Sequence, residues 1–284
     1  MSTLESLLPV KPMSFAPATP TFLQWQGWQQ YYALWLGVLS ILSLLAVWWV
    51  VSTLQVVSPL FLPTPLAVWD KFVVVSTTGF MDATLWQHTL ASLQRILIGL
   101  VFAVVLGVPL GLWMGCSKVF KGLLDPLVEI YRPIPPLAYL PLLVIWFGIG
   151  EVTKVLLIFL AILAPIIIAT AHGVLATSTS RKRAALSLGA SPQQLLAYVI
   201  LPSALPSILT GIRIGLGAGW STLVAAELVA ATRGLGFMVQ SAAQFLVTDT
   251  VILGILVIAL IAFAIEMALR QLQKHLTPWY TQCD

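Results

Sequence analysis

Long apolar stretches constrain this chain more than any other feature of its sequence. A helix rises about 1.5 Å per residue, so about 20 apolar residues are needed to cross a hydrocarbon core of roughly 30 Å. Residues 34–54 contain no charged side chain, and residues 96–114 are interrupted only by glycines and Pro109. The sequence therefore predicts an all-α, polytopic membrane protein with about six transmembrane helices. The remaining four candidate spans are 126–147, 155–171, 208–231 and 251–269.

The composition agrees with this prediction and excludes an ordinary soluble domain. Hydrophobic residues make up 59% of the 284 residues and charged residues only 8%, whereas soluble globular domains carry about 25% charged residues. The span 126–147 differs from the others because it contains Glu129, Arg132 and five prolines. Since prolines interrupt helices, we expect a broken span there.

The distribution of basic residues predicts the orientation of the chain. The first thirty residues contain four prolines and no apolar run suited to a signal peptide, so we expect 1–31 to form a cytoplasmic tail and 32–284 the transmembrane domain. Eight basic residues then lie inside and four outside, as the positive-inside rule requires, and both termini face the cytoplasm. The inner set is Lys11, Lys118, Lys121, Arg181, Lys182, Arg183, Arg270 and Lys274, and the outer set is Lys71, Arg95, Lys154 and Arg233.

Two of the predicted spans carry small residues at every fourth position. Such faces let helix backbones approach closely in lipid, where no hydrophobic force drives association. We favour packing within one bundle over a dimer interface as the explanation for this spacing. The residues are Gly99, Ala103, Gly107, Gly111 and Gly115 in the second span, and Gly211, Gly215 and Gly219 in the fifth.

Residues 173–202, between the fourth and fifth spans, form the longest polar stretch on the inferred cytoplasmic side. Ser180 can cap a first short helix over residues 181–188. Gly189 can then supply the left-handed residue that ends this helix. The three basic residues 181–183 would lie in its first turn, where the helix dipole disfavours cations. Anionic lipid, an acidic partner or the setting of topology would each explain them.

A second short helix is predicted in the same loop. Ser191 can act as its cap, with Pro192 at the first helical position and Gln194 placed to close a capping box. Pro202 would lie just beyond its end. The loop is therefore expected to consist of two short helices joined at Gly189.

These loop residues resemble the "EAA" loop of the permeases of binding-protein-dependent ABC importers, with its Glu-Ala-Ala, a glycine four positions later and an Ile-x-Leu-Pro-like ending. The chain has Arg183 where many members have Glu, which leaves the role of this first position open. In that family the loop is a coupling helix that docks into a cytoplasmic ATPase subunit. The residues that carry the resemblance are Arg183, Ala184, Ala185, Gly189, Ile200, Leu201 and Pro202.

The resemblance extends over most of the chain, roughly residues 60–279, and is closest to the taurine and sulfonate permeases. It implies a type I ABC importer fold, a homodimer of the permease, two ATPase subunits that bind ATP and Mg²⁺, and an extracytoplasmic binding protein, with no cofactor in this chain. Nitrate, bicarbonate or longer alkanesulfonates are the alternative cargoes. The stretches that carry this closer likeness are 79–88, 123–151, 219–242 and 276–279.

Four ionisable residues within the predicted spans are candidates for a translocation pathway, because an intramembrane charge is costly unless it is paired or wetted. Glu129 and Arg132 are three residues apart, and we favour a local ion pair for them. Arg213 and Glu227 are fourteen residues apart, so both can point to one face of a helix. Arg213 can attract a sulfonate, although snorkelling to the interface explains its position equally well.

The sequence offers no support for catalysis, metal binding or nucleic-acid binding. Its histidines, His88, His172 and His275, are scattered, and no HExxH, GxSxG or phosphate-loop motif occurs. We expect His88 to be a surface residue near a membrane boundary. Cys116 and Cys283 have neither disulfide nor metal-ligand spacing. An intramembrane enzyme and a secondary transporter are the rival classes, and the sequence lacks the paired residues or inverted repeats that they need.

Overall fold

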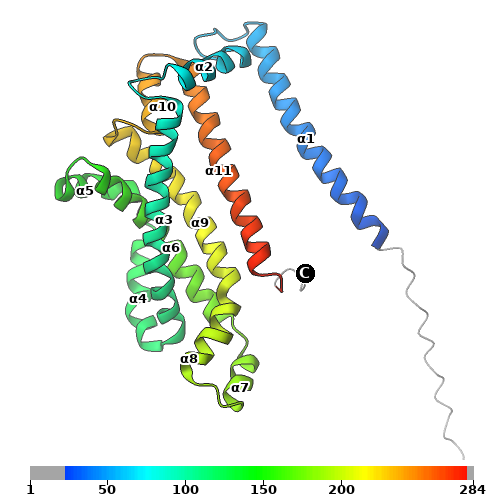
Figure 1. Cartoon of the computed structure of the whole chain (residues 1–284), viewed down its shortest axis with the longest axis vertical. Helices are drawn as coiled ribbons and strands as arrows, with labels where there is room; N and C mark the ends of the chain where they lie inside the picture. The colour runs from blue at the N-terminus through cyan, green and yellow to red at the C-terminus, as the bar shows by residue number, and fades with distance from the viewer. Residues whose placement is uncertain (1–22, 280–284) are drawn as a thin grey trace, which may run out of the picture. The chain divides into compact units, whose positions relative to one another are not determined.

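The computed structural model describes residues 23–279 (Figure 1). The predictions for Lys11, Cys283 and most of the tail lie outside the described residues. The chain divides into two compact units after Val56, and each is described by itself.

The first unit contains one long helix, α1 (Leu23–Thr53), with a mean hydropathy of 2.0 over its apolar part. Its apolar side chains are exposed on all sides, as Trp35 and Leu44 illustrate at 71% exposure each. A helix that is apolar all round over a length sufficient to cross a membrane is suited to lipid. The helix begins at Leu23, inside the tail predicted for residues 1–31, because the residues that precede the first span also favour helix.

The second unit consists of helices throughout its described part, residues 57–279. Helices α2, α3 and α10 begin near one another at one end of this unit, and the short helices α7 and α8 lie at the other end (Figure 1). The elements are α2 (Pro65–Thr77), α3 (Leu85–Cys116), α4 (Lys118–Tyr131), η1 (Pro136–Tyr139), α5 (Leu140–Phe147), α6 (Glu151–Leu175), α7 (Thr179–Ser187), α8 (Pro192–Leu195), η2 (Leu196–Ile200), α9 (Leu201–Ala230), α10 (Leu235–Gln244) and α11 (Thr248–Leu276).

The prediction of about six spans is confirmed. Within the described residues, α1, α3, α6, α11 and the helix formed by α8, η2 and α9 are each long and apolar enough to cross a membrane. The sixth is the predicted broken span, in which α4 and the segment Pro136–Phe147 meet at 89°. Pro133, Pro135 and Pro136 lie at this break, and proline cannot continue a helix without losing a backbone hydrogen bond.

Helix α6 lies at the centre of the second unit, packed between α3 and α9. A Cβ atom added to Gly99 of α3 would lie 2.9 Å from Ile158 Cγ2, and one added to Gly219 of α9 would lie 2.8 Å from Ile162 Cδ1. The glycine faces of α3 and α9 therefore admit the branched side chains of α6. This confirms the prediction that the small-residue spacing serves packing within one bundle.

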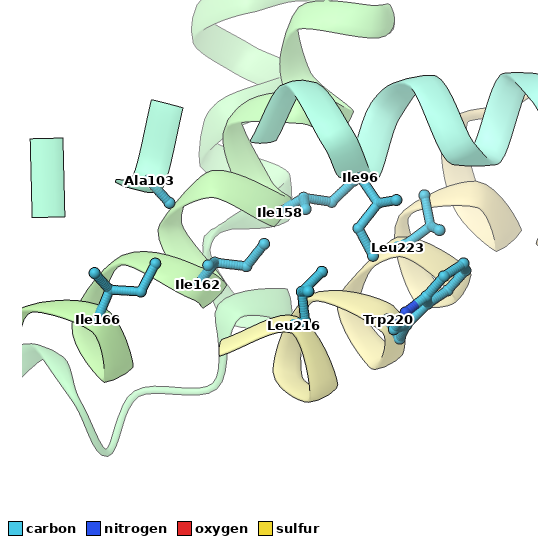
Figure 2. Close-up of a cluster of buried hydrophobic side chains, with 8 residues drawn as sticks. All are labelled: Ile96, Ala103, Ile158, Ile162, Ile166, Leu216, Trp220 and Leu223. Carbon is cyan, nitrogen blue, oxygen red and sulfur yellow. The ribbon is translucent and has the colours of Figure 1, made fainter. Parts of the chain in front are cut away.

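The largest buried apolar cluster joins these same three helices, as Figure 2 shows. Ile158, Ile162 and Ile166 follow one face of α6 and are fully buried. Lipid is as apolar as these side chains, so close packing rather than removal from water holds the helices together. The cluster consists of Ile96, Ala103, Ile158, Ile162, Ile166, Leu216, Trp220 and Leu223.

The two ends of the second unit carry the polar side chains. We call the end with α7 and α8 the loop end, and the opposite end, with α10 and the start of α3, the far end. At the far end, Thr248 Oγ1 donates a hydrogen bond to the Leu60 carbonyl at 2.5 Å, and Lys71 pairs with Asp249 at 3.4 Å. These contacts attach α2 and the segment before it to α11.

Candidate functional site

The first short helix of the loop end starts earlier than predicted. Helix α7 spans Thr179–Ser187, its N-cap is Ser178, and no side chain caps it. The Ser178 carbonyl accepts a helical hydrogen bond from Lys182 N at 3.2 Å, so the helical turn already encloses Ser180. The prediction that Ser180 caps this helix is therefore wrong. Arg183 and Ala184 are exposed and Ala185 is half-buried, so two of these three positions face outward.

Two of the basic residues in the first turn of α7 have partners within the chain. Lys182 Nζ donates to the Val174 carbonyl at 3.2 Å, and Arg181 Nη1 donates to Ser203 Oγ at 3.2 Å. Val174 lies in the last turn of α6, where a cation satisfies a free carbonyl and complements the helix dipole. Contacts with α6 and α9 thus offset the unfavourable place of these cations in α7.

Gly189 ends α7 in the left-handed conformation, with φ of +82°, as predicted. A Cβ atom at this position would meet no atom within 4 Å, so the backbone conformation alone favours glycine here. The preceding residue, Leu188, is 89% exposed.

The start of the second helix matches the prediction, but its end does not. Ser191 and Gln194 form the capping box, with Pro192 in the first turn. The helix then continues through a π turn, η2, in which Leu201 N donates to the Leu196 carbonyl, and runs on as α9. Pro202 lies in the first turn of α9 instead of beyond a helix end. The wide turn before Pro202 accommodates its missing N–H.

The seven predicted loop residues therefore divide into two groups. Gly189 and the residues of α7 lie at the exposed tip. Ile200 is 8% exposed and packs with Val174, Ala204 and Ile208, so residues 200–202 attach the loop to the bundle. Both groups belong to the same helical hairpin, in which α7 and the helix that starts with α8 are joined at Gly189.

The far end contains a cluster of polar and charged side chains joined by hydrogen bonds, which we call the far-end cluster. Its members are buried except Glu151, whose side chain is 62% exposed. Arg95 is at its centre: its Nε and Nη2 donate to the two oxygens of Glu151 at 2.6 and 2.8 Å, and its Nη1 donates to Glu227 Oε1 at 2.6 Å. Lys154 Nζ reaches Glu151 Oε1 at 2.9 Å. Arg95 and Lys154 are 5% and 3% exposed and Glu227 is fully buried. The cluster consists of His88, Ser92, Arg95, Glu151, Lys154 and Glu227.

Three backbone N–H groups at the start of α10 are satisfied by this cluster. Gly236 N donates to Glu227 Oε2 at 2.8 Å, Leu235 N to Ser92 Oγ at 2.9 Å and Gly234 N to His88 Nδ1 at 3.1 Å. A carboxylate at a helix N-terminus is also favoured by the helix dipole. Side chains of α3 and α9 thus hold α10 in place.

The prediction that His88 is a surface residue is wrong, since His88 is fully buried. Its Nδ1 accepts the hydrogen bond from Gly234 N, so the proton must be on Nε2, which lies 3.0 Å from the Phe80 carbonyl that it can donate to. The ring therefore bridges the segment before α3 and the start of α10.

The pathway candidates Arg213 and Glu227 have separate partners. Arg213 forms an ion pair with Glu266 of α11 and donates to Gln273 Oε1 at 3.2 Å, whereas Glu227 belongs to the far-end cluster. Glu266 also pairs with Arg270 at 3.0 Å. Arg213 is thus held by α11, and a role for either residue in translocation stays a prediction.

The other two pathway candidates do not form the local ion pair that we favoured. Glu129 and Arg132 are both exposed, and their side chains make no hydrogen bond or ion pair with any described residue. Arg132 lies at the break of the third span and lines a cavity of about 330 Å³ against α6 and α9, whereas Glu129 does not line it. The two side chains therefore have different surroundings although they are one helical turn apart.

Sequence reasoning missed most of the far-end cluster and the exposed Leu188. Arg95 and Lys154 were counted only as outer basic residues that set topology. The spacing of Glu151 and Lys154, three residues apart, was an available signal for a local ion pair. The position of Leu188 beside a predicted left-handed glycine was an available signal for an exposed apolar side chain at the tip of the loop.

Comparison with known families identifies the class of protein. Residues 107–282 match the family described as "Binding-protein-dependent transport system inner membrane component". The chain is 59% identical over 259 residues to the taurine transport system permease protein TauC of Escherichia coli strain K12, covering 91% of this chain and 94% of that protein. It is 37% identical over 237 residues to the putative aliphatic sulfonates transport permease protein SsuC of the same organism, covering 84% and 89%.

Comparison with solved structures supports the fold. A chain of the MetNI methionine ABC transporter in an inward-facing conformation aligns with a TM-score of 0.59 at 20% identity, covering 66% of this chain and 93% of that one. At this identity the likeness concerns the fold alone. The relatives are permease subunits of transporters and not enzymes.

Proposed function

Because the chain belongs to the family of inner membrane components of binding-protein-dependent transport systems, we propose that this ABC importer permease carries taurine or a related small sulfonate. The observation that supports this cargo most strongly is the 59% identity to a taurine permease over 91% of the chain. Identity to the aliphatic sulfonate permease is 37%, which makes longer alkanesulfonates the second candidate. Identity to a bicarbonate permease of Synechococcus elongatus is 30% over 247 residues, so bicarbonate ranks below the sulfonates.

In the proposed complex, two copies of this chain form the membrane channel. Two ATPase subunits bind ATP and Mg²⁺ in the cytoplasm, and a binding protein delivers the cargo on the opposite side of the inner membrane. The loop end then faces the cytoplasm, and so do both termini. Lys118, Lys121 and the basic residues 181–183 support this orientation, because such residues concentrate on the cytoplasmic side.

The exposed tip of the loop is the proposed contact with the ATPase. Leu188 is the anchor that enters a groove of the ATPase, with Arg183, Ala184 and Ala185 around it. Gly189 fixes the direction in which this anchor points. ATP binding draws the two ATPase subunits together, and each loop moves with its subunit.

The route of this motion into the bundle follows the continuous helix from α8 to α9. This helix covers Pro192–Val229, 38 residues, and begins beside Gly189 and ends beside the far-end cluster. A displacement at its start therefore reaches Glu227, α10 and the core contacts with α6. Alternating access follows when these helices tilt as a group.

The proposal is tested with the permease, its ATPase and its binding protein reconstituted in liposomes. Radiolabelled taurine should accumulate when ATP is supplied to the ATPase side, and unlabelled taurine should compete better than a longer alkanesulfonate, nitrate or bicarbonate. Liposomes with an ATPase variant that binds ATP without hydrolysing it serve as the control. Stronger competition by bicarbonate or nitrate than by taurine would assign the permease to another cargo.

A further inference from the structure

The cavity at the break of the third span lies about halfway along α6, because it is lined by residues 160–169 of this helix, which spans Glu151–Leu175. Its volume of about 330 Å³ is near the lower end of the range for small-molecule sites, roughly 300–1,000 Å³. Most of the wall is small or apolar, and the phenol of Tyr131 is fixed by a 2.5 Å hydrogen bond to the Leu160 carbonyl. The cavity therefore suits a small ligand at the depth of the membrane centre.

Arg132 is the one charged side chain among the described residues that line this cavity. The other three arginines in the described spans of the second unit have carboxylate partners: Arg95 pairs with Glu151 and Glu227, and Arg213 and Arg270 pair with Glu266. Arg132 makes no hydrogen bond or ion pair with a described residue. An unpaired charge at membrane depth is costly, so its retention beside a cavity indicates that its counter-charge is supplied by a ligand.

The cavity wall also contains a backbone acceptor. Pro165 has no N–H, so it cannot donate the helical hydrogen bond that the Ala161 carbonyl would normally receive. Ala161 and Pro165 both line the cavity. The wall thus combines the guanidinium of Arg132 with a carbonyl oxygen that lacks its usual helical donor.

We propose that this cavity is a transient binding site for a short aminoalkanesulfonate, in which the Arg132 guanidinium binds the sulfonate and the Ala161 carbonyl accepts a hydrogen bond from the ammonium group. This inference rests on the proposed function, because it takes the cargo to be a small sulfonate. A guanidinium matches the oxygens of a sulfonate through two parallel hydrogen bonds. The negative sulfonate thus lies against the guanidinium, and the positive ammonium group lies against the carbonyl oxygen. The small volume of the cavity excludes long alkyl chains.

The test is the Arg132→Gln variant in the reconstituted transporter, with taurine uptake and binding-protein-stimulated ATP hydrolysis measured on the same liposomes. Uptake should fall about tenfold or more, since a hydrogen bond to a charged group is lost. Stimulated ATP hydrolysis should stay at the wild-type rate, because Arg132 has no part in the loop end. Lys121→Gln is the matched control, since Lys121 is an exposed cation of the same helix that does not line the cavity.

Two outcomes would overturn the site. Wild-type uptake by Arg132→Gln would show that the guanidinium does not hold the cargo. Equal loss of uptake and ATP hydrolysis would show that Arg132 instead maintains the structure on which both activities depend. Failure of the wild-type complex to carry taurine is a separate result: it contradicts the proposed cargo, and an Arg132 effect on another small sulfonate would still support the site.

A second variant tests the carbonyl. Pro165→Ala restores an N–H that can bond to the Ala161 carbonyl, and alanine is well tolerated inside a helix. Taurine uptake should fall several-fold, whereas uptake of ethanesulfonate, which lacks the ammonium group, should change little when it is supplied at a concentration that saturates the binding protein. An equal change for both compounds would contradict the role of this carbonyl.

Discussion

The loop end and the far end of the second unit both carry charged residues, but these residues differ in burial and in hydrogen bonding. At the loop end, Arg183 is exposed, and no residue of α7 is buried. At the far end, Arg95, Lys154 and Glu227 are buried and joined by short hydrogen bonds. The contrast indicates that the loop end is built for contact with another molecule, whereas the far end is held together by its own residues.

This difference predicts which substitutions destabilise the fold and which only uncouple transport from ATP hydrolysis. Removing one member of a buried ion pair leaves an uncompensated charge. Removing an exposed loop side chain leaves the fold intact. The variants below are ordered by the expected loss of stability.

Glu227→Ala should have the largest effect. It leaves Glu151 as the one carboxylate partner of Arg95 and removes the acceptor of the Gly236 N–H, so the free energy of unfolding should fall by about 3–5 kcal/mol. Thermal unfolding of the purified permease in detergent measures this change. Glu129→Ala, at an exposed site, should stay within about 0.5 kcal/mol of wild type. Similar losses for the two variants would remove the distinction between the buried and exposed carboxylates.

Gly234→Ala should have the next largest effect on stability. Gly234 has φ of +140°, and a Cβ atom there would overlap the Glu227 carboxylate. Backbone strain at such positions costs about 1–3 kcal/mol. Gly217→Ala is the matched control, because a Cβ atom at Gly217 meets nothing within 4 Å and alanine favours the helix. An unchanged melting temperature for Gly234→Ala would mean that the start of α10 is not fixed by the cluster.

Gly189→Val tests the loop end. A non-glycine residue in the left-handed conformation costs about 1–2 kcal/mol, and this cost is confined to the exposed turn. Membrane insertion should be unaffected, whereas substrate-stimulated ATP hydrolysis and uptake in the reconstituted complex should be abolished. Gly189→Asn should retain most activity, since asparagine adopts this conformation more readily. Normal transport by the valine variant would contradict the coupling role of Gly189.

Leu188→Ala should have the smallest effect on stability, within about 0.5 kcal/mol, yet it should weaken ATPase binding. Loss of an apolar anchor at the centre of an interface typically costs more than about 1 kcal/mol of binding energy, so the Kd for the ATPase subunit should rise about fivefold or more. Binding is measured with the permease in lipid nanodiscs. The comparison is Leu186→Ala, since Leu186 is a less exposed leucine of α7, the helix that Leu188 follows. Equal Kd values for both variants would contradict the anchor role.

The sequence predicted those features that depend on neighbouring residues. The spans follow from the length of apolar runs, the break at Pro133–Pro136 from proline chemistry, and the turn at Gly189 and the cap at Ser191 from rules that act over a few residues. The family resemblance added the loop residues and the cargo. Apart from the resemblance, each of these signals is contained in one short segment.

The far-end cluster was not predicted because its partners are far apart in the chain. Arg95 and Glu227 are separated by 132 positions, and His88 and Gly234 by 146. From its neighbours in the sequence, Arg95 cannot be distinguished from an arginine that sets topology, and His88 cannot be distinguished from a surface histidine. The continuation of α8 into α9 was missed for a different reason: Pro202 was expected to lie beyond a helix end, but it lies in the first turn of α9, after the wide turn η2.

The far-end cluster also has an electrical consequence. Arg95 and Lys154 each carry one positive charge, and Glu151 and Glu227 each carry one negative charge, so the formal charges sum to zero. A transmembrane potential of 100 mV does about 2.3 kcal/mol of work on each elementary charge that crosses the membrane, but none on a neutral group that moves as a unit. Voltage therefore does no net work on this cluster when it moves as an intact unit.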